Sequence, residues 1–181
     1  MDDSSPRLRA ILFDRDDTLV EDVPYNGDPD RVRPVPHAHE ALRRARRAGL
    51  RTGVVSNQSG IARGILTVVQ VDAVNAQVER MLGPFDVWRY CPHVPEDGCR
   101  CRKPQPGMIR SAARELGLSP AEVAMIGDIG ADVEAAAAAG ARGVLVPTSR
   151  TRPEEVQAAA VVAPDLVAAV ALLLEDAGGL S

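Results

Sequence analysis

Aromatic residues are scarce in this sequence, making up 3% of its 181 residues. Stacking platforms for nucleic-acid bases are therefore not expected, and aliphatic and Ala side chains must build the core. A surplus of positive charge is also missing, because the formal net charge is -4. That balance argues against a general binder of nucleic acid or of membrane surfaces. No apolar run approaches the ~18 residues of a membrane-spanning helix.

A signal peptide is not recognisable either, because residues 1–6 are acidic and polar and contain no apolar segment. We therefore expect a cytoplasmic protein whose thiols stay reduced. Cys is restricted to Cys91, Cys99 and Cys101, an odd number that excludes complete disulfide pairing. The length fits a single domain over residues 1–181.

What the sequence does contain is a regular alternation of short apolar stretches and helical patterns. We predict strands at 9–13, 50–55, 86–90, 123–126 and 143–146. We predict helices at 36–48, 67–82, 106–116, 131–139, 153–160 and 165–174. This alternation predicts an α/β fold, a Rossmann-like three-layer α/β/α sandwich with a mostly parallel sheet. Because ligands bind beyond the carboxyl ends of such strands, chemical residues are expected there.

Two acids one residue apart, Asp14 and Asp16, follow the first predicted strand. One carboxylate can attack phosphorus while the other protonates the leaving oxygen and later activates water. A polar loop with a Thr-assisted turn would produce the same pattern without any chemistry. The pair gains weight only together with polar residues after the other strands.

Such residues are present. Hydroxyl, amide and backbone donors that can bind phosphate oxygens follow the second strand at Ser56, Asn57, Gln58 and Ser59. Asp128 follows the fourth strand and offers the oxygen ligand that Mg²⁺ prefers. Asp132 stands at the start of the next helix, where a carboxylate also suits the helix N-terminus. Judged alone, the Ser- and Asn-rich segment is equally compatible with an ordinary turn.

Two cationic residues, Arg102 and Lys103, precede the helix predicted at 106–116. Lys103 can neutralise charge on a transferring phosphoryl group, and Arg102 can hold a substrate oxygen or a second phosphate in a bidentate manner. Surface charge is the usual alternative for any Arg-Lys pair.

Directly before this pair lies a complete Cys₃His donor set for zinc, formed by Cys91, His93, Cys99 and Cys101. Reduced cysteines in a loop are the alternative. A site with four protein ligands has no open position, so we expect the Zn²⁺ to be structural. The zinc-binding loop 91–101 would then orient Arg102 and Lys103.

Four motifs follow one another along the chain, around Asp14, Ser56, Lys103 and Asp128. In this order they resemble the motifs of the haloacid dehalogenase superfamily. The resemblance implies a Mg²⁺-dependent phosphatase that forms a phosphoaspartyl intermediate on Asp14, with Asp16 as acid/base. It also implies Mg²⁺ ligation by the Asp14 carboxylate, the Asp16 backbone carbonyl and Asp128. Ser56 and Lys103 would stabilise the phosphoryl group.

Within this superfamily, residues 56–64 (SNQSGIARG) and 101–108 (CRKPQPGM) look like those of the heptose-bisphosphate phosphatases. That resemblance implies hydrolysis of a sugar bisphosphate, with D-glycero-D-manno-heptose 1,7-bisphosphate as the best candidate and heptose 1-phosphate as its product. The implied substrate-binding residues are Asp22, Tyr25, Ser56, Asn57, Gln58, Ser59, Arg102 and Lys103. The histidinol-phosphatases share the zinc loop, and the short spacing between His93 and Cys99 looks more like theirs.

Asp17 departs from the superfamily pattern, in which Gly usually follows the second acid. Gly adopts unusual backbone angles without steric cost. Asp tolerates left-handed angles but adds a negative charge beside the nucleophile. We expect lower activity than in a Gly-bearing relative unless Asp17 points to solvent, and Asp17→Gly should then raise turnover.

The inserts between the motifs are short, so we expect no separate cap domain and a relatively open site. We also expect a monomer, without nucleic-acid or membrane partners. Three interpretations remain open at this point. They are a sugar-bisphosphate phosphatase, a histidinol-phosphatase or other small phosphomonoesterase, and a noncatalytic binding domain stabilised by zinc.

Overall fold

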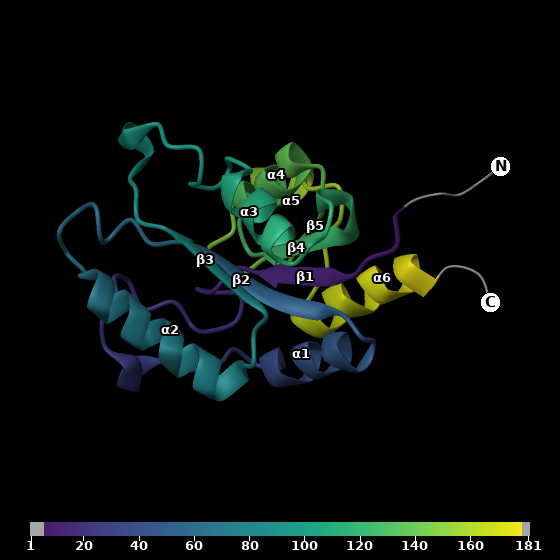
Figure 1. The fold of residues 1–181 in the computed structure, drawn as a ribbon, viewed down its shortest axis with the longest axis horizontal. Helices are drawn as coiled ribbons and strands as arrows, with labels where there is room; N and C mark the ends of the chain where they lie inside the picture. Colours follow the sequence, from purple (N-terminus) through teal and green to yellow (C-terminus); the bar gives the residue numbers. More distant parts are fainter. Residues whose placement is uncertain (1–5, 179–181) are drawn as a thin grey trace.

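The computed structural model describes residues 6–178, and its centre is a parallel sheet (Figure 1). Five strands lie side by side in the order β3-β2-β1-β4-β5. Their bounds are β1 (Ala10–Phe13), β2 (Arg51–Asn57), β3 (Val87–Cys91), β4 (Val123–Gly127) and β5 (Arg142–Leu145). All four neighbouring pairs are parallel, as the alternation of strands and helices predicts.

Helices cover both faces of the sheet and complete the three layers (Figure 1). One face carries α1 (Ala38–Arg47), α2 (Val68–Leu82) and α6 (Leu166–Gly178). The other face carries α3 (Gly107–Glu115), α4 (Gly130–Ala139) and α5 (Pro153–Ala158). Three 3-10 turns lie in the connections, at Pro29–Arg31, Pro95–Asp97 and Pro120–Glu122. The predicted α/β/α sandwich is therefore confirmed.

The central strand β1 is buried on both faces, which explains its continuous apolar sequence. Ile11 and Phe13 point to one face and pack with α1, α2 and α6. Ala10 and Leu12 point to the other face and pack with α3 and α4. All four residues are fully buried, so the end of β1 is a rigid platform for the residue that follows it.

Several element boundaries differ from the prediction by one to four residues. The first helix begins at Ala38 rather than at 36, because His37 adopts a left-handed backbone with φ of 67°. Strand β2 extends to Asn57, because Ser56 and Asn57 still pair with Tyr90 and Cys91 of β3. None of the helices in the described part of the chain is both long and apolar enough to span a membrane.

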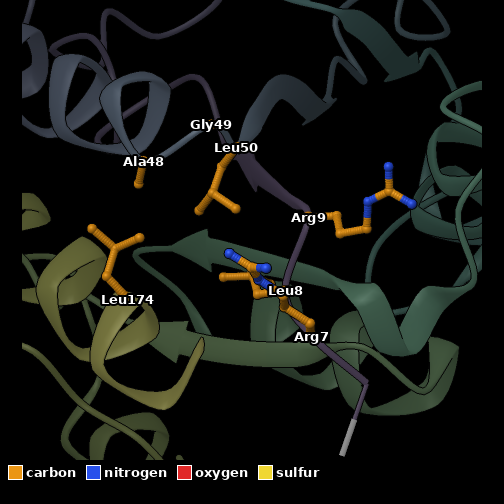
Figure 2. A pocket seen from close by; sticks show the side chains of 7 residues that line it. All are labelled: Arg7, Leu8, Arg9, Ala48, Gly49, Leu50 and Leu174. Atoms are coloured by element: carbon orange, nitrogen blue, oxygen red, sulfur yellow. The ribbon is translucent and has the colours of Figure 1, made fainter. Parts of the chain in front are cut away.

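A cavity of about 370 Å³ lies at the amino ends of β1 and β2 (Figure 2). Its lining comes from residues 7–9, directly before β1, from the turn between α1 and β2, and from Leu174 of α6. Leu50 and Leu174 border it from two different elements, and no acidic side chain lines it. The carboxyl ends of the strands lie at the opposite edge of the sheet.

Candidate active site

Asp14 is the first residue after β1 and lies at the centre of the carboxyl edge of the sheet. β1 is flanked by β2 and β4, and the Asp14 N–H donates to the Ile126 carbonyl of β4 at 2.9 Å. Asp128 is the first residue after β4 and lies at the same edge. Parallel strands thus bring together two predicted acids that are far apart in the sequence.

A buried lysine joins these acids. Lys103 Nζ donates to Asp14 Oδ1 at 2.7 Å and to the Val55 carbonyl at 2.9 Å. It also lies 2.7 Å from Asp132 Oδ1. Carboxyl oxygens of Asp14, Asp128 and Asp132 lie within 4.8 Å of one another and could hold a metal ion. The cluster therefore contains three carboxyl groups and only one ammonium group to balance their charge.

The place of Asp132 depends on Gly127 and on the start of α4. The Asp132 carboxylate accepts a hydrogen bond from the Ile129 N–H at 3.2 Å, so it caps the helix N-terminus. A Cβ on Gly127 would lie 2.1 Å from Asp132 Oδ2, so only glycine fits there. Because Asp132 is also fully buried against Lys103, it fixes the direction of the lysine as well as the helix.

Burial controls the ionisation of this cluster. Burial raises the pKa of Asp14 to about 7, with Lys103 opposing the rise and Asp132 and Asp16 adding to it. Burial and the charges of Asp14 and Asp132 raise the pKa of Asp128 to about 8. Burial alone would lower the pKa of Lys103, but Asp132 and Asp14 outweigh that effect and raise it. The cluster therefore favours a proton or a cation at neutral pH.

Asp16 lies beside the cluster and is held by two side chains. Arg15 Nε and Nη2 each donate to an Asp16 carboxylate oxygen at 3.1 Å. Gln58 Nε2 donates to Asp16 Oδ2 at 2.9 Å and to Ser56 Oγ at 2.8 Å. Arg15 itself is buried, and its Nη1 donates to Asn75 of α2 at 2.7 Å. The Asp16 side chain is 27% exposed, so its direction is set while one side stays open.

A cavity of about 310 Å³ opens over these groups. It is lined by Asp14, Asp16 and Asp128, together with the predicted substrate residues Asp22, Ser56, Asn57, Arg102 and Lys103. An adjoining cavity of about 300 Å³ shares Asp16, Asp22 and Asn57 with it and adds Tyr25, Gln58 and Ser59. The predicted substrate residues thus fall into two connected groups, and Tyr25, Gln58 and Ser59 do not line the cavity that contains Asp14.

Asn57 connects β2 to the segment that carries Lys103. Its Oδ1 accepts a hydrogen bond from the Lys103 N–H at 3.1 Å, and its Nδ2 donates to the Lys103 carbonyl at 3.2 Å. Both ends of the Asn57 amide are therefore engaged by the main chain of Lys103. Arg102 has a separate anchor, since its Nη1 donates to the His93 carbonyl at 3.1 Å.

The four predicted zinc ligands converge beside this segment. Their ligand atoms lie within 4.8 Å of one another and could hold a metal ion. Cys101 Sγ lies 3.0 Å from Cys91 Sγ, 3.5 Å from Cys99 Sγ and 3.3 Å from His93 Nδ1. Donors bound to one zinc ion at ~2.3 Å lie roughly 3.8 Å apart in a tetrahedron. The cysteines are free thiols, so three sulfurs and one imidazole fit a zinc centre.

Other residues at the site were not predicted from the sequence. Thr18 Oγ1 donates to Asp128 Oδ1 at 3.2 Å, and Thr151 Oγ1 donates to the Asp128 carbonyl at 2.6 Å. Arg150, one residue before Thr151, also lines the main cavity. Both follow β5, so the rule that chemical residues follow strands could have found them. Arg15 stands between the two acids of the first motif, but nothing in the sequence indicates that it is buried.

Asp17 adopts a left-handed backbone with φ of 56°, as its place in the motif predicts. Its Oδ1 accepts a hydrogen bond from the Asp22 N–H at 3.1 Å, and its Oδ2 lies 3.6 Å from Arg150 Nη1. The same Arg150 nitrogen contacts the Asp22 carboxylate. Burial raises the pKa of Asp22, although Arg150 opposes the rise. Asp17 therefore does not simply point to solvent, because its charge has a cationic partner.

Known proteins are similar to this chain in fold and in sequence. Residues 100–172 match the family described as HAD-hydrolase-like. The crystal structure of D,D-heptose 1,7-bisphosphate phosphatase from B. bronchiseptica, complexed with magnesium and phosphate, has a TM-score of 0.82 to this chain. The two sequences are 32% identical, and the match covers 93% of this chain and 99% of that chain.

Two curated relatives match over nearly their whole length. The chain is 35% identical to the D-glycero-beta-D-manno-heptose-1,7-bisphosphate 7-phosphatase of Bordetella bronchiseptica, over 94% of this chain and 100% of that protein. It is 34% identical to the enzyme of the same name from Pseudomonas aeruginosa, over 91% of this chain and 97% of that protein. With such identity across almost the full length of these relatives, the chain belongs to the haloacid dehalogenase-like family of phosphatases.

Proposed function

We propose that this protein is a Mg²⁺-dependent phosphatase that removes the 7-phosphate of D-glycero-D-manno-heptose 1,7-bisphosphate and leaves heptose 1-phosphate. The observation that carries the proposal is the Asp14–Lys103 pair at the base of a cavity, with Asp16 beside it. The relatives of about 35% identity that bear this enzyme's name support the choice of substrate.

The proposed reaction has two steps. In the first, an Asp14 carboxylate oxygen attacks phosphorus while Asp16 donates a proton to the departing sugar oxygen. In the second, Asp16 takes a proton from water, and that water attacks the phosphorus of the phosphoaspartate and releases inorganic phosphate. Asp16 is then protonated again, and Asp14 is free. Gln58 supports both steps because it holds the Asp16 carboxylate and the Ser56 hydroxyl from one amide nitrogen.

The Asp14 and Asp128 carboxylates, with the Asp16 backbone carbonyl, are the proposed Mg²⁺ ligands. The convergence of the Asp14 and Asp128 carboxylates and the raised pKa values of both acids fit a site for a hard cation with oxygen ligands. Bound Mg²⁺ supplies positive charge that offsets the repulsion between an anionic carboxylate and an anionic phosphate. Lys103 contributes to the same end from within the protein.

We further propose that Zn²⁺ is bound by the Cys₃His cluster and holds loop 91–101 in place. This loop and the segment around Tyr25 would shape the mouth of the site in a single-domain monomer without a cap. Histidinol phosphate is the second candidate substrate, because the short spacing between His93 and Cys99 looks more like that of the histidinol-phosphatases. The middle of this loop is a single 3-10 turn, Pro95–Asp97, which leaves little chain to enclose a sugar.

The test is phosphate release from a panel of compounds in the presence of Mg²⁺. The panel contains both anomers of the heptose 1,7-bisphosphate, fructose 1,6-bisphosphate, histidinol phosphate and p-nitrophenyl phosphate. We expect the heptose bisphosphate to give the highest kcat/KM, with phosphorus NMR of the product showing that the C1 phosphate remains. Asp14→Asn should reduce kcat more than about a thousandfold, because it removes the nucleophile.

Asp30→Asn is the matched control, because Asp30 is an exposed acid in a 3-10 turn that lines neither cavity. Preference for histidinol phosphate would replace the proposed substrate with the second candidate. Release from none of the compounds by a folded, zinc-loaded protein would favour the noncatalytic binding domain. Equal loss in both Asp variants would remove the assignment of Asp14.

A further inference from the structure

Arg150 projects its guanidinium at the rim of the main cavity. Its Nη1 contacts the Asp22 carboxylate and lies 3.6 Å from Asp17 Oδ2. The loop that carries it is anchored by the next residue, Thr151, which donates to the Asp128 carbonyl at 2.6 Å. The main chain of Arg150 is thus held beside the acid cluster. Its side chain is 55% exposed, so the guanidinium is open to solvent and to the cavity.

Three cationic side chains line this cavity, and they differ in how many of their N–H donors are already used by protein groups. Lys103 is buried and already meets three oxygens, on Asp14, Asp132 and Val55. Its charge is confined to the base of the cavity. Arg102 uses one nitrogen on the His93 carbonyl. Arg102 and Arg150 are therefore the two cations that a charged group outside the base of the cavity can reach.

The ion pairs of Arg150 do not prevent it from taking a further ligand. These ion pairs are open to water on the Arg150 side, where the side chain is 55% exposed, so water solvates the guanidinium and the pairs hold it only weakly. A phosphate dianion offers more charge than a carboxylate and three acceptor oxygens, so it competes for the planar guanidinium. The carboxylates of Asp17 and Asp22 then serve to hold the guanidinium at the rim before the ligand arrives.

We infer that Arg150, positioned by Asp17 and Asp22, binds a second phosphate of the substrate in a subsite at the rim of the cavity, distal to the phosphate that Asp14 attacks. It does so beside Arg102, which the sequence already predicts to contact the substrate. The inference rests on the proposed function and deepens it, because it assigns the residues that distinguish a sugar bisphosphate from a monophosphate. It also gives the acid at position 17, where the family pattern has Gly, a role in holding the cation that binds substrate.

The test compares heptose 1,7-bisphosphate with heptose 7-phosphate, using the full-length, zinc-loaded protein with Mg²⁺. Values of kcat/KM are measured for the wild type, Arg150→Gln, Arg150→Lys and Arg152→Gln. Arg152 lies two residues away in the same loop, is 74% exposed and pairs with Glu155, so it is a matched control. We expect Arg150→Gln to lower the ratio of kcat/KM for the bisphosphate over the monophosphate about tenfold, mainly through KM.

Arg150→Lys should restore part of this ratio, because it returns the charge but not the planar fork. Arg152→Gln should leave it unchanged. The subsite is overturned if Arg150→Gln lowers both substrates by the same factor, or changes neither. It is also overturned if the wild type hydrolyses the monophosphate as well as the bisphosphate, a result that leaves the phosphatase activity itself intact. Release of phosphate from neither compound by the wild type overturns the proposed function, and the subsite with it.

Discussion

Asp17 has a backbone that favours glycine and a side chain that binds two neighbours. Its φ of 56° is a conformation that Asp tolerates better than most residues. The cost of adding a charge close to Asp14 and Asp16 is reduced by Arg150 and by the hydrogen bond from the Asp22 N–H. Replacing Asp17 therefore changes two things at once, the charge near the nucleophile and the position of Arg150.

We predict that these two effects separate in kinetics. Asp17→Gly should raise kcat for a monophosphate about two- to fivefold, which corresponds to relief of a charge interaction of up to about 1 kcal/mol. The same variant should raise KM for the bisphosphate, because Arg150 loses one of its two carboxylate partners. Steady-state kinetics with both substrates measure the two parameters.

Asp17→Asn is the matched control for this prediction. Asn also tolerates the left-handed conformation and can still accept the hydrogen bond from Asp22, but it carries no charge. If the effects come from charge, Asn and Gly behave alike. If Asp17→Gly leaves kcat equal or lower, the idea that Asp17 slows turnover is wrong.

At the residue scale, the sequence predicts which side chains gather at the site when they directly follow strands. Asp14 and Asp128 are examples, because a parallel sheet brings every strand end to one edge. Arg15 and Thr18 were missed although they lie in the first motif, because burial and contacts with α2 and β4 decide their roles. Arg150 was missed although it follows β5, because its partners, Asp17 and Asp22, lie at the other end of the chain.

At the scale of elements, loop 91–101, which carries the proposed zinc ligands, is joined directly to the segment that carries Lys103. Cys101 is followed at once by Arg102 and Lys103. The Arg102 N–H donates to Cys99 Sγ at 3.4 Å, so the metal ligands also order the main chain of the cation-bearing segment. A zinc ion on the four proposed ligands would thus help to position Lys103, and Asn57 holds the main chain of Lys103 from the side of β2.

We predict that Cys99→Ser loses bound zinc and weakens substrate binding without unfolding the sheet. Elemental analysis should show about one zinc per wild-type chain and a large loss in the variant. We expect KM for the bisphosphate to rise about tenfold or more, because the loss of a metal ligand releases the segment that carries Arg102. Circular dichroism should show nearly unchanged secondary structure, since the α-helices and all strand residues except Cys91, the last residue of β3, lie outside the loop.

Arg100→Ala is the matched control for this loop, because Arg100 lies between two ligands and is exposed. It should keep both the zinc and the wild-type KM. A Cys99→Ser protein that retains one zinc, or that loses zinc and keeps its KM, would contradict the link between the metal and the substrate site.

The sequence predicted which elements exist better than where they end. Apolar periodicity identifies the strands and helices because burial imposes it. The ends depend on pairing and backbone angles that periodicity does not contain, as with the extension of β2 along β3 and the late start of α1 after His37. The order of the strands was also outside the prediction, because it depends on which crossover covers which face.

For the molecule as a whole, the acid cluster couples folding to pH. The pKa of Asp14 is raised to about 7 and that of Asp128 to about 8, both by burial first. Between their ordinary value of 3.8 and these raised values, the folded chain binds more protons than the unfolded chain. Stability without a bound cation therefore falls as pH rises through this window, which runs from about pH 4 to 8.

We predict that Asp128→Asn stabilises the zinc-loaded protein in magnesium-free buffer, and that the gain in Tm over the wild type grows from pH 5 to pH 9. The variant removes one buried charge from a cluster of three carboxyl groups and keeps a hydrogen-bond acceptor for Thr18. Each kcal/mol gained should raise Tm by about 2–4 °C. Thermal unfolding followed by circular dichroism measures this difference at each pH.

Added Mg²⁺ supplies the control for the same experiment. It should raise Tm of the wild type most at high pH, where both acids are ionised and proton competition is weakest, and should have little effect on Asp128→Asn. Asp30→Asn, which removes an exposed acid, should follow the wild type in both buffers. If the difference in Tm between Asp128→Asn and the wild type does not grow with pH, burial is not holding a proton on this cluster. If Mg²⁺ stabilises both proteins equally, Asp128 is not a ligand of the ion.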